Sequence, residues 1–444
     1  MRMRTILIPL LALALTAAAC GDDTGDTTVP PDASTVPSTP GSSGGLQISS
    51  LARAVPEVPD ADLLAVADGN RAFAAELFAE LGREDGNLVF SPASIQLALT
   101  MAFAGAAGDT AAEMQDALHL PFAGNRLHAA MNALDAAIEA RNREEPPGPD
   151  DVERKVLVAI ANALWGQDGF AFEEDFLDTL AQDYGAGMRI VDFVEATEAA
   201  RRTINQWVAD ETNDRITDLI PEGVLGPMVR LVLTNAVYLD ATWMIPFDPE
   251  ATADGAFTLL DGTQITIPIM HQEELLPYAS GEGWQAVELP YVGGELAMTL
   301  VVPDEGRYGE IEAEAGGLFD AARGSEARMV RLGLPSFEFR TQAGLGDVLR
   351  SLGMATAFDP ATADFSGMTA VERLFISDVI HEAFIAVDEA GTEAAAATAV
   401  VMRATAAPAD AVTLQIDRPF LFSLHDRQTG TVLFMGRVLD PSAG

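Results

Sequence analysis

The chain of 444 residues offers few side chains that are able to carry out covalent or metal chemistry. It has one cysteine, Cys20, which excludes an internal disulfide, a thiolate zinc cage and a cysteine nucleophile in the body of the protein. The histidines are scattered and show no HxxxH or HxH pairing, which argues against a metal site. They are His119, His128, His271, His381 and His425. The sequence therefore predicts no metal and no cofactor.

One serine lies in a pattern that hydrolases use. Residues 41–45, Gly-Ser-Ser-Gly-Gly, match the GxSxG nucleophile elbow, which needs a strand before it and a helix after it. The surrounding residues 21–50 are rich in Pro, Gly, Ser, Thr and Asp, a composition typical of a flexible tether. We interpret the match as chance and expect that the protein is not an enzyme.

Cys20 follows a segment typical of an export signal. Two arginines precede the apolar residues 5–19, a stretch of 15 residues that is shorter than the ~20 needed to span a bilayer as a helix. Small residues lead directly to Cys20, as in a bacterial lipobox, although Ala17 stands where Leu is more usual. We predict a signal peptide over 1–19 and a secreted, extracellular protein tethered to the cell surface through lipid on Cys20. An ordinary secretory signal cut before Cys20 is the alternative.

Composition and charge exclude further classes. Hydrophobic residues make up 48% of the chain, which is enough for a large core. Lys and Arg number 26 against 67 Asp and Glu, giving a net charge of −41, and Lys155 is the single lysine. Because phosphate repels so acidic a surface, we expect no nucleic-acid partner. The few arginines near residues 126–143 lie among acids, so heparin binding is not expected either.

The most informative stretch runs from Asp388 to Asp410. It follows the strand-like run 384–387, breaks at Gly391-Thr392 and continues with four alanines. A connection of more than twenty residues between strands is long, and such loops are usually functional or lack structure. Small uncharged residues over 394–399 would enter between existing strands at little steric or desolvation cost. The segment is thus either a plain surface loop or a loop whose first half becomes a strand.

Helices are expected mainly in the first half of the chain and strands in the second. Apolar spacing predicts helices over 62–82 and 201–220, and a third after Ser91-Pro92, with Ser91 as its cap. Strands are expected over 155–165, 229–239, 286–289, 296–302, 329–334 and 374–379, with a hairpin formed by 420–424 and 432–438. This order favours an α+β fold over a doubly wound parallel sheet.

These features together resemble the serpin family over about residues 60–441. The stretch 389–398 is similar to the hinge of an inhibitory serpin's reactive-centre loop. Other matching segments are 87–95 (NLVFSPASI), 204–208 (INQWV), 233–239 (LTNAVYL), 288–291 (ELPY), 374–381 (LFISDVIH), 418–422 (RPFLF) and 434–438 (FMGRV). Each match is weak alone, but their order and spacing are specific.

The resemblance implies a serpin fold in which helices pack around a large mixed β-sheet plus smaller sheets, with an exposed reactive-centre loop at about 389–412. One serpin domain over 59–444 would follow a linker over 20–58. The implied function is inhibition of serine-type endopeptidases by a suicide-substrate mechanism, in which the cleaved loop inserts into the large sheet. Thr392 to Thr405 is 14 residues, which as a strand would reach ~45 Å at ~3.3 Å per residue.

The resemblance also assigns roles to residues of the loop. The hinge consists of Glu389, Gly391, Thr392, Glu393, Ala394, Ala395, Ala396, Ala397 and Thr398. Counting from Gly391 places the reactive bond between Thr405 and Ala406, and a slip in the count would make Arg403 or Met402 the specificity residue. Thr405 suits the small pocket of elastase- or subtilisin-like proteases, whereas Arg403 suits trypsin-like ones. Cysteine proteases are a further alternative.

Two polar groups are implied elsewhere. Ser91, Ser94, Asn235 and His381 match the family's shutter, beneath the place where the sheet opens, and Trp243 with Glu389 matches the breach, where the loop first enters. No recognisable motif gives His381 a serine and an aspartate partner, so a catalytic triad is not expected. The implied partners are target serine proteases, held in a covalent complex by a monomeric inhibitor. A serpin-fold binding protein that does not inhibit is the alternative.

Overall fold

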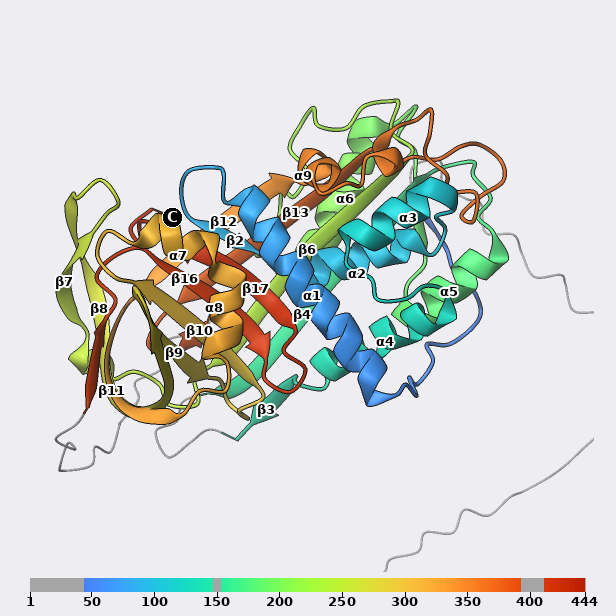
Figure 1. Cartoon of the computed structure of the whole chain (residues 1–444). Coiled ribbons are helices and arrows are strands. Elements are labelled where there is room, and N and C mark those ends of the chain that lie inside the picture. Colours follow the sequence, from blue (N-terminus) through green and yellow to red (C-terminus); the bar gives the residue numbers. More distant parts are fainter. Residues whose placement is uncertain (1–43, 147–152, 393–410, 444) are drawn as a thin grey trace, which may run out of the picture. The chain divides into compact units, whose positions relative to one another are not determined.

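The computed structural model describes residues 44–146, 153–392 and 411–443 (Figure 1). The helices are α1 (Asp60–Leu81), α2 (Pro92–Phe103), α3 (Gly108–Ala117), α4 (Asn125–Glu139), α5 (Glu174–Tyr184), α6 (Thr197–Glu211), α7 (Tyr308–Ala313), α8 (Ala315–Ala322) and α9 (Gly346–Ser351). The strands are β1 (Gly44–Gln47), β2 (Leu88–Phe90), β3 (Arg143–Glu145), β4 (Arg154–Gln167), β5 (Met188–Val191), β6 (Leu231–Thr242), β7 (Ala253–Thr258), β8 (Gln264–Gly281), β9 (Trp284–Pro290), β10 (Leu296–Pro303), β11 (Ala327–Pro335), β12 (Phe337–Gly344), β13 (Asp378–Val387), β14 (Gly391–Thr392), β15 (Val412–Gln415), β16 (Phe420–Asp426) and β17 (Val432–Val438).

A large mixed sheet carries the site. Its strand order is β1-β5-β4-β6-β14-β13-β12, and β3 pairs with β4 at one end. β4 with β5 and β6 with β13 are parallel pairs, whereas the other neighbours are antiparallel. β6 and β13 pair with each other only over 232–237 and 378–383. We call the boundary between these two strands the seam.

The second sheet holds the remaining strands. Its order is β15-β11-β8-β9-β10-β16-β17-β2, with β7 paired to β8. β8 spans Gln264–Gly281 and pairs with β7, β11 and β9 in turn, so it joins two smaller sheets into one. The C-terminal hairpin β16–β17 lies between β10 and the end strand β2, and all residues of both strands are buried.

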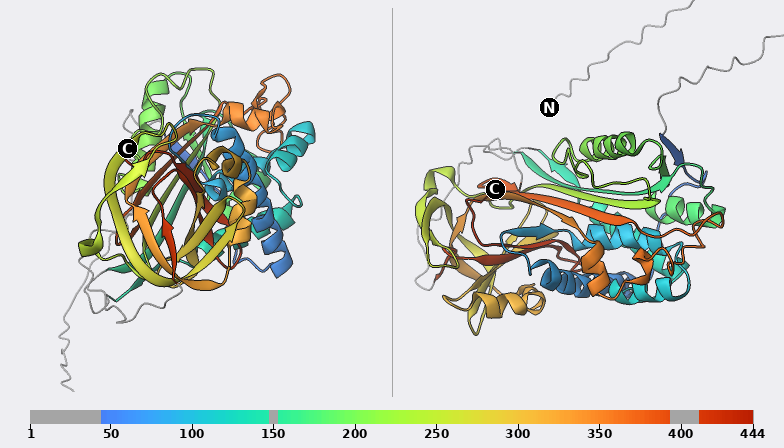
Figure 2. Two further views of the ribbon diagram at one scale, coloured as in Figure 1. Left: turned by 60° about the vertical axis from the view of Figure 1, so that its left-hand side comes forward. Right: turned by 90° about the horizontal axis from the view of Figure 1, so that it is seen from above.

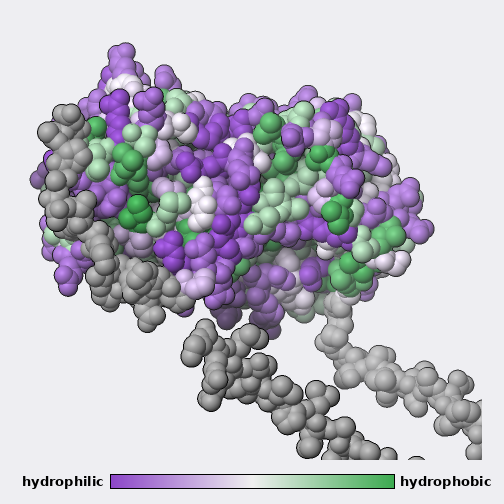
Figure 3. All heavy atoms as spheres, turned by 90° about the horizontal axis from the view of Figure 1, so that it is seen from below, coloured by the Kyte–Doolittle hydropathy of each residue, from purple (hydrophilic) through white to green (hydrophobic). Residues whose placement is uncertain are grey.

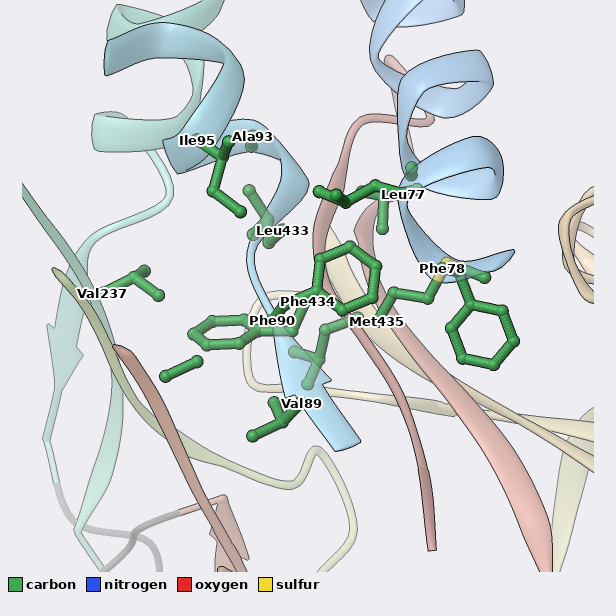
Figure 4. Close-up of a cluster of buried hydrophobic side chains, with 14 of the residues drawn as sticks. Leu77, Phe78, Val89, Phe90, Ala93, Ile95, Val237, Leu433, Phe434 and Met435 are labelled. Carbon is green, nitrogen blue, oxygen red and sulfur yellow. The ribbon is translucent and has the colours of Figure 1, made fainter. Parts of the chain in front are cut away.

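The large sheet has an outer and an inner face, each with its own core. α6 covers the outer face, where Trp165, Val232 and Ala236 pack against the helix (Figure 2). The inner face meets α2 and the second sheet in a core that includes Phe90 of β2 and Phe434 of β17 (Figure 4). Side chains alternate between the two faces along a strand, and β6 follows this rule: its odd-numbered residues face inward and its even-numbered residues outward.

Most elements that the sequence predicts are present. The helix predicted over 62–82 is α1, and the helix capped by Ser91 is α2, where the Ser91 side chain accepts a hydrogen bond from the Ser94 backbone N–H. The predicted strand 155–165 is β4, and the terminal hairpin is β16–β17. The α+β class is confirmed, and the chain forms one large mixed sheet and a second sheet packed with helices.

Two boundaries differ from the prediction. The helix predicted over 201–220 is α6, which ends at Glu211. It ends there because Asn213 and Asp214 have φ of 51° and 61°, a left-handed conformation that cannot continue a helix. The strand predicted over 374–379 begins only at Asp378. The residues before it make backbone hydrogen bonds that do not belong to a strand ladder. The Ile376 N–H donates to the Ala357 carbonyl, and the Ser377 N–H donates to the Leu231 carbonyl.

The end of the predicted linker also differs. Residues 44–47 form β1, which pairs antiparallel with β5 and covers one edge of the large sheet. Farther along, Arg53 donates hydrogen bonds to Asn132 and Glu139 of α4, and the Ala54 N–H donates to the Gln182 carbonyl. The folded body therefore includes residues from 44 on. Composition missed this because β1 is held by backbone hydrogen bonds, which make little demand on side-chain type.

The surface reflects the acidic composition. Hydrophilic residues predominate on the face shown in Figure 3, and the hydrophobic ones form separate groups. Within the described parts of the chain, no helix is both long and apolar enough to cross a bilayer.

Candidate functional site

The site lies where β6 and β13 end, because β14 is placed between the C-terminal ends of these two strands. β14 is only Gly391 and Thr392, yet Thr392 pairs with Ala241 of β6 on one side and with Val387 of β13 on the other. The Thr392 side chain is 2% exposed, and its hydroxyl lies 2.6 Å from the Tyr291 hydroxyl on the inner face. Gly391 and Thr392, two residues of the predicted hinge, thus form a strand within the sheet.

A tight turn delivers the chain to this position. The Asp388 carboxylate accepts hydrogen bonds from the backbone N–H groups of Ala390 and Gly391, at 2.8 and 3.0 Å. The Asp388 N–H in turn donates to the Gly391 carbonyl at 3.0 Å. A Cβ on Gly391 would lie 2.0 Å from the Ala241 carbonyl oxygen, so no side chain fits there. The turn and the close approach at Gly391 together direct the backbone between β6 and β13.

Of the two predicted breach residues, Glu389 is part of this turn and Trp243 contacts it. Trp243 is 1% exposed and stacks on Tyr291 with ring centroids 4.5 Å apart. Its indole N–H donates to the Asp388 carbonyl at 3.0 Å. Glu389 accepts a hydrogen bond from the Thr252 hydroxyl at 2.6 Å. Trp243 therefore has two roles. Its ring packs in the core under the sheet, and its indole N–H binds the turn.

Below Thr392 the two strands are not paired with each other. Ladder pairs between β6 and β13 end at Val237 and Ala383, whereas β14 pairs with β6 only at 241–242. Between these points, no ladder pair joins Leu239 or Asp240 of β6 to Phe384–Ala386 of β13 among the described residues. These backbone groups are available to a strand that would continue from Thr392.

The four predicted shutter residues meet at the paired part of the seam. Asn235 of β6 and His381 of β13 are direct register partners, and His381 Nδ1 is hydrogen-bonded to Asn235 Oδ1. The Asn235 side-chain amide also donates to the Ser94 hydroxyl of α2. The Ser91 N–H donates to His381 Nε2 at 3.2 Å. One hydrogen-bonded cluster thus links α2 to both strands.

The structure adds Asn162 of β4 to this cluster. Its Oδ1 accepts from Ser94 and Asn235, and its Nδ2 donates to the Ser94 carbonyl at 3.0 Å. An asparagine in the otherwise apolar run 156–165 was the available signal. Tyr291 lies in the matching segment 288–291, and its contacts with Trp243 and Thr392 arise only in the fold.

Burial controls the protonation of the shutter histidine. His381 is fully buried, and burial lowers its pKa to about 3, so the ring is neutral at physiological pH. This state suits its contacts, because Nδ1 donates to Asn235 while Nε2 accepts from the Ser91 N–H. Both ring nitrogens are occupied by structural hydrogen bonds, which leaves neither for a catalytic triad.

Several predicted residues lie outside the described parts of the chain. They are Cys20, Glu393, Ala394, Ala395, Ala396, Ala397, Thr398, Met402, Arg403, Thr405 and Ala406. Within the described parts, no group of three or more His, Cys, Asp or Glu side chains is placed to hold a metal ion.

Comparison with known proteins identifies the family. The family model for Serpin (serine protease inhibitor) matches residues 68–441. An uncharacterised serpin-like protein of Thermococcus kodakarensis is 39% identical over 383 residues, which cover 85% of this chain and 86% of the relative. Human leukocyte elastase inhibitor is 33% identical over 395 residues, covering 85% and 99%. The thermophilic serpin tengpin in its native state has a TM-score of 0.76 at 29% identity, covering 87% and 97%. The chain belongs to the serpin family.

Proposed function

We propose that this serpin inhibits serine proteases as a suicide substrate, by cleavage and insertion of its reactive-centre loop. The observation that carries the proposal is the position of Thr392, which is paired with Ala241 on one side and Val387 on the other. A strand continuing from Thr392 would find hydrogen-bonding partners on both sides of the seam. Each new ladder bond and each buried side chain would lower the free energy of the cleaved form.

The register of β14 supports insertion along the whole seam. Continuing it would place Ala394 opposite Leu239 and Ala396 opposite Val237, both on the inner face. Small side chains there fit under the sheet without displacing its core. The same register brings Thr398 between Asn235 and His381, where its hydroxyl would enter the shutter cluster. A polar residue would therefore arrive at the polar position and alanines at the apolar ones.

The chemistry belongs to the target protease. Its serine oxygen would attack the carbonyl of Thr405, the peptide bond would break, and Ala406 would leave with a free amine. The hinge half of the loop would remain as an ester of the protease. Insertion would then carry the protease along the sheet and distort its active site before water hydrolyses the ester. Inhibition succeeds if insertion is faster than hydrolysis.

We infer elastase- or subtilisin-like proteases as targets. Thr405 lies among alanines and suits a small, shallow pocket, and one relative carries the name leukocyte elastase inhibitor. Arg403 gives trypsin-like targets as the alternative, and cysteine proteases are a further one. We further propose that the protein is exported and held at the cell surface by lipid on Cys20, which the apolar segment before this residue supports.

The test is to mix the purified chain with pancreatic elastase, subtilisin and trypsin and to separate the products by denaturing electrophoresis. A complex that survives denaturation supports inhibition, and mass spectrometry of the released fragment locates the reactive bond. Digestion of the loop without any such complex would instead favour the alternative, a serpin-fold binding protein. A Ser→Ala variant of each protease is the matched control and should form no covalent complex.

A further inference from the structure

A cavity of about 270 Å³ lies beside β4, on the side of this strand that is away from β6 and the seam. Its wall includes Met101 of α2, Ile138 of α4, Tyr184 of α5 and Glu211 at the end of α6. The volume is far above the ~15 Å³ that one water molecule needs. It is close to the ~300 Å³ at which small-molecule sites begin. The cavity is therefore large enough to hold a short segment of a peptide.

β4 leaves part of its edge unpaired at this cavity. β3 pairs only with residues 154–156 of β4, and β5 pairs only with residues 164–167. Between them the Asn142 side chain takes the place of a strand, because it donates to the Val158 carbonyl at 3.1 Å and accepts from the Val158 N–H at 2.7 Å. Alternate residues of a strand direct their backbone groups to the same edge, so the N–H and C=O of Ile160 also point to this edge. Ile160 lines the cavity and has no ladder partner on this edge among the described residues.

The cavity wall is acidic. Among the described residues that line it, Asp135, Glu139 and Glu211 carry carboxylates and Arg53 is the single cation. The Arg53 guanidinium contacts Asp135 Oδ2 and donates to Glu139 at 3.2 Å, whereas Asp135 Oδ1 accepts no hydrogen bond within the described parts of the chain. Burial raises the pKa of Asp135 although the nearby Arg53 opposes this rise, so the carboxylate is incompletely compensated. The wall thus already binds one guanidinium group and keeps an acceptor for a second cation.

We propose that this cavity binds an extended peptide with a basic side chain, whose backbone pairs with Ile160 and whose cationic group meets Asp135. A residue paired with Ile160 shares its face of the sheet. This is the inner face, where Ile138 of α4 packs in the same core as Val158. Addition of a peptide to a free strand edge supplies backbone hydrogen bonds, and the acidic wall selects the basic side chain. The inference does not depend on the proposed inhibition, because it concerns the edge of β4 that is away from the seam.

The test is isothermal titration calorimetry of the full chain at low salt with N-acetyl-alanyl-arginyl-alanine amide. This peptide should bind about tenfold more tightly than the same peptide with glutamate in place of arginine, because the glutamate would meet the carboxylates of the wall. A methyl group on the backbone nitrogen of the arginine should weaken binding about fivefold, because it removes the donor to the Ile160 carbonyl. Agmatine, which carries a guanidinium group but no peptide backbone, should also bind more weakly than the arginine peptide.

Variants of the wall locate the binding site. Asp135→Asn should weaken binding of the arginine peptide about tenfold. Glu139→Gln with Glu211→Gln changes two exposed side chains and should also weaken it, which keeps the test valid if Asp135→Asn folds poorly. The matched control is Glu144→Gln, an exposed residue of β3 that does not line the cavity, and it should bind as the natural chain does.

Four results would overturn the proposal. They are no binding of the arginine peptide, equal binding of the glutamate peptide, equal binding of agmatine or of the methylated peptide, and binding that the wall variants leave unchanged. The last result is also what a peptide inserted into the seam would give, so the variants separate the two locations.

Discussion

Thr392 is the residue at which the loop and the large sheet are already joined. Its backbone completes the ladder between β6 and β13, and its hydroxyl meets Tyr291 in a site closed to solvent. The pocket around it accepts a small side chain with one hydroxyl group. A larger or charged side chain would have to be dehydrated without a partner.

Replacing Thr392 tests the direction of insertion. Thr392→Arg should turn the inhibitor into a substrate, because a guanidinium group facing the inner core would cost about 3–5 kcal/mol when left unpaired. Electrophoresis should then show a cleaved loop and little covalent complex. Thr392→Ser is the control, because it keeps a small side chain with a hydroxyl group at this position and should still form the complex. If Thr392→Arg consumed the same number of moles of inhibitor per mole of protease as the natural chain, insertion by this route would be contradicted.

His381 predicts how stability depends on pH. Burial lowers its pKa to about 3, whereas an unfolded histidine has a pKa near ~6.5. Between these values the unfolded state binds more protons, so stability is fully present above pH ~6.5 and is lost as the pH falls toward 3. The slope should be on the order of 1 kcal/mol per pH unit. Protonated Nε2 would also face the Ser91 N–H that it now accepts from.

The measurement compares urea unfolding of the natural chain and of His381→Gln between pH 7.5 and 4. The variant should be less stable at pH 7.5 but should lose less stability on acidification. His128, whose pKa burial lowers to about 4, is present in both proteins and cancels in the comparison. Parallel curves for the two proteins would show that His381 does not titrate as expected.

At the scale of elements, the seam combines a closed part and an open part. The shutter cluster ties β6, β13, β4 and α2 together where the ladder is complete, and the breach holds the turn where the ladder is interrupted. A strand that enters must therefore pass from the breach to the shutter. Under the proposed mechanism, the residues after Thr392 would supply both the inserting strand and the reactive bond, so the register of insertion would decide which residue a protease recognises.

The loop's specificity tests that register. Thr405→Arg should shift inhibition from elastase toward trypsin, because a trypsin-like pocket holds an acid at its base. Arg403→Ala should leave elastase inhibition almost intact. The measurement is the rate at which each variant associates with elastase and with trypsin. Loss of inhibition of every protease in Arg403→Ala would place the reactive bond two residues earlier than we predict.

At the scale of the whole molecule, the intact fold leaves bonding capacity unused. Among the described residues, no ladder pair joins 239–240 of β6 to 384–386 of β13. Under the proposed mechanism, a loop strand inserted there would make the cleaved form more stable than the intact form. The net charge of −41 adds repulsion within the fold and would steer basic proteases toward it at low salt.

Cleavage should release the stored free energy. About ten new ladder hydrogen bonds at about 1 kcal/mol each would raise the melting temperature of the cleaved form by about 10 °C or more. Circular dichroism melting of the intact chain and of the chain nicked in the loop measures this difference. A Thr392→Arg chain nicked in the same way is the control and should gain less. Equal midpoints for intact and cleaved natural chain would rule out a metastable intact form.

The sequence by itself determined the family and the α+β class, and it predicted the hinge and shutter residues. These follow from local order: motifs at fixed spacing, a cap at Ser91, and the contrast between apolar runs and a long alanine-rich connection. It misjudged boundaries such as the end of α6 at Glu211, where two left-handed residues end the helix. It also assigned residues 44–47 to the linker, because backbone pairing leaves little trace in composition.

Only the tertiary structure decided the contacts that join distant segments. Thr392 between Ala241 and Val387, Asn162 in the shutter, and Lys155 beside Asp240 each connect residues far apart in sequence. Periodicity shows which face of a strand a residue occupies but not which strand lies next to it. Register across the seam is set by the packing of both cores against the sheet, and that information exists only in the folded chain.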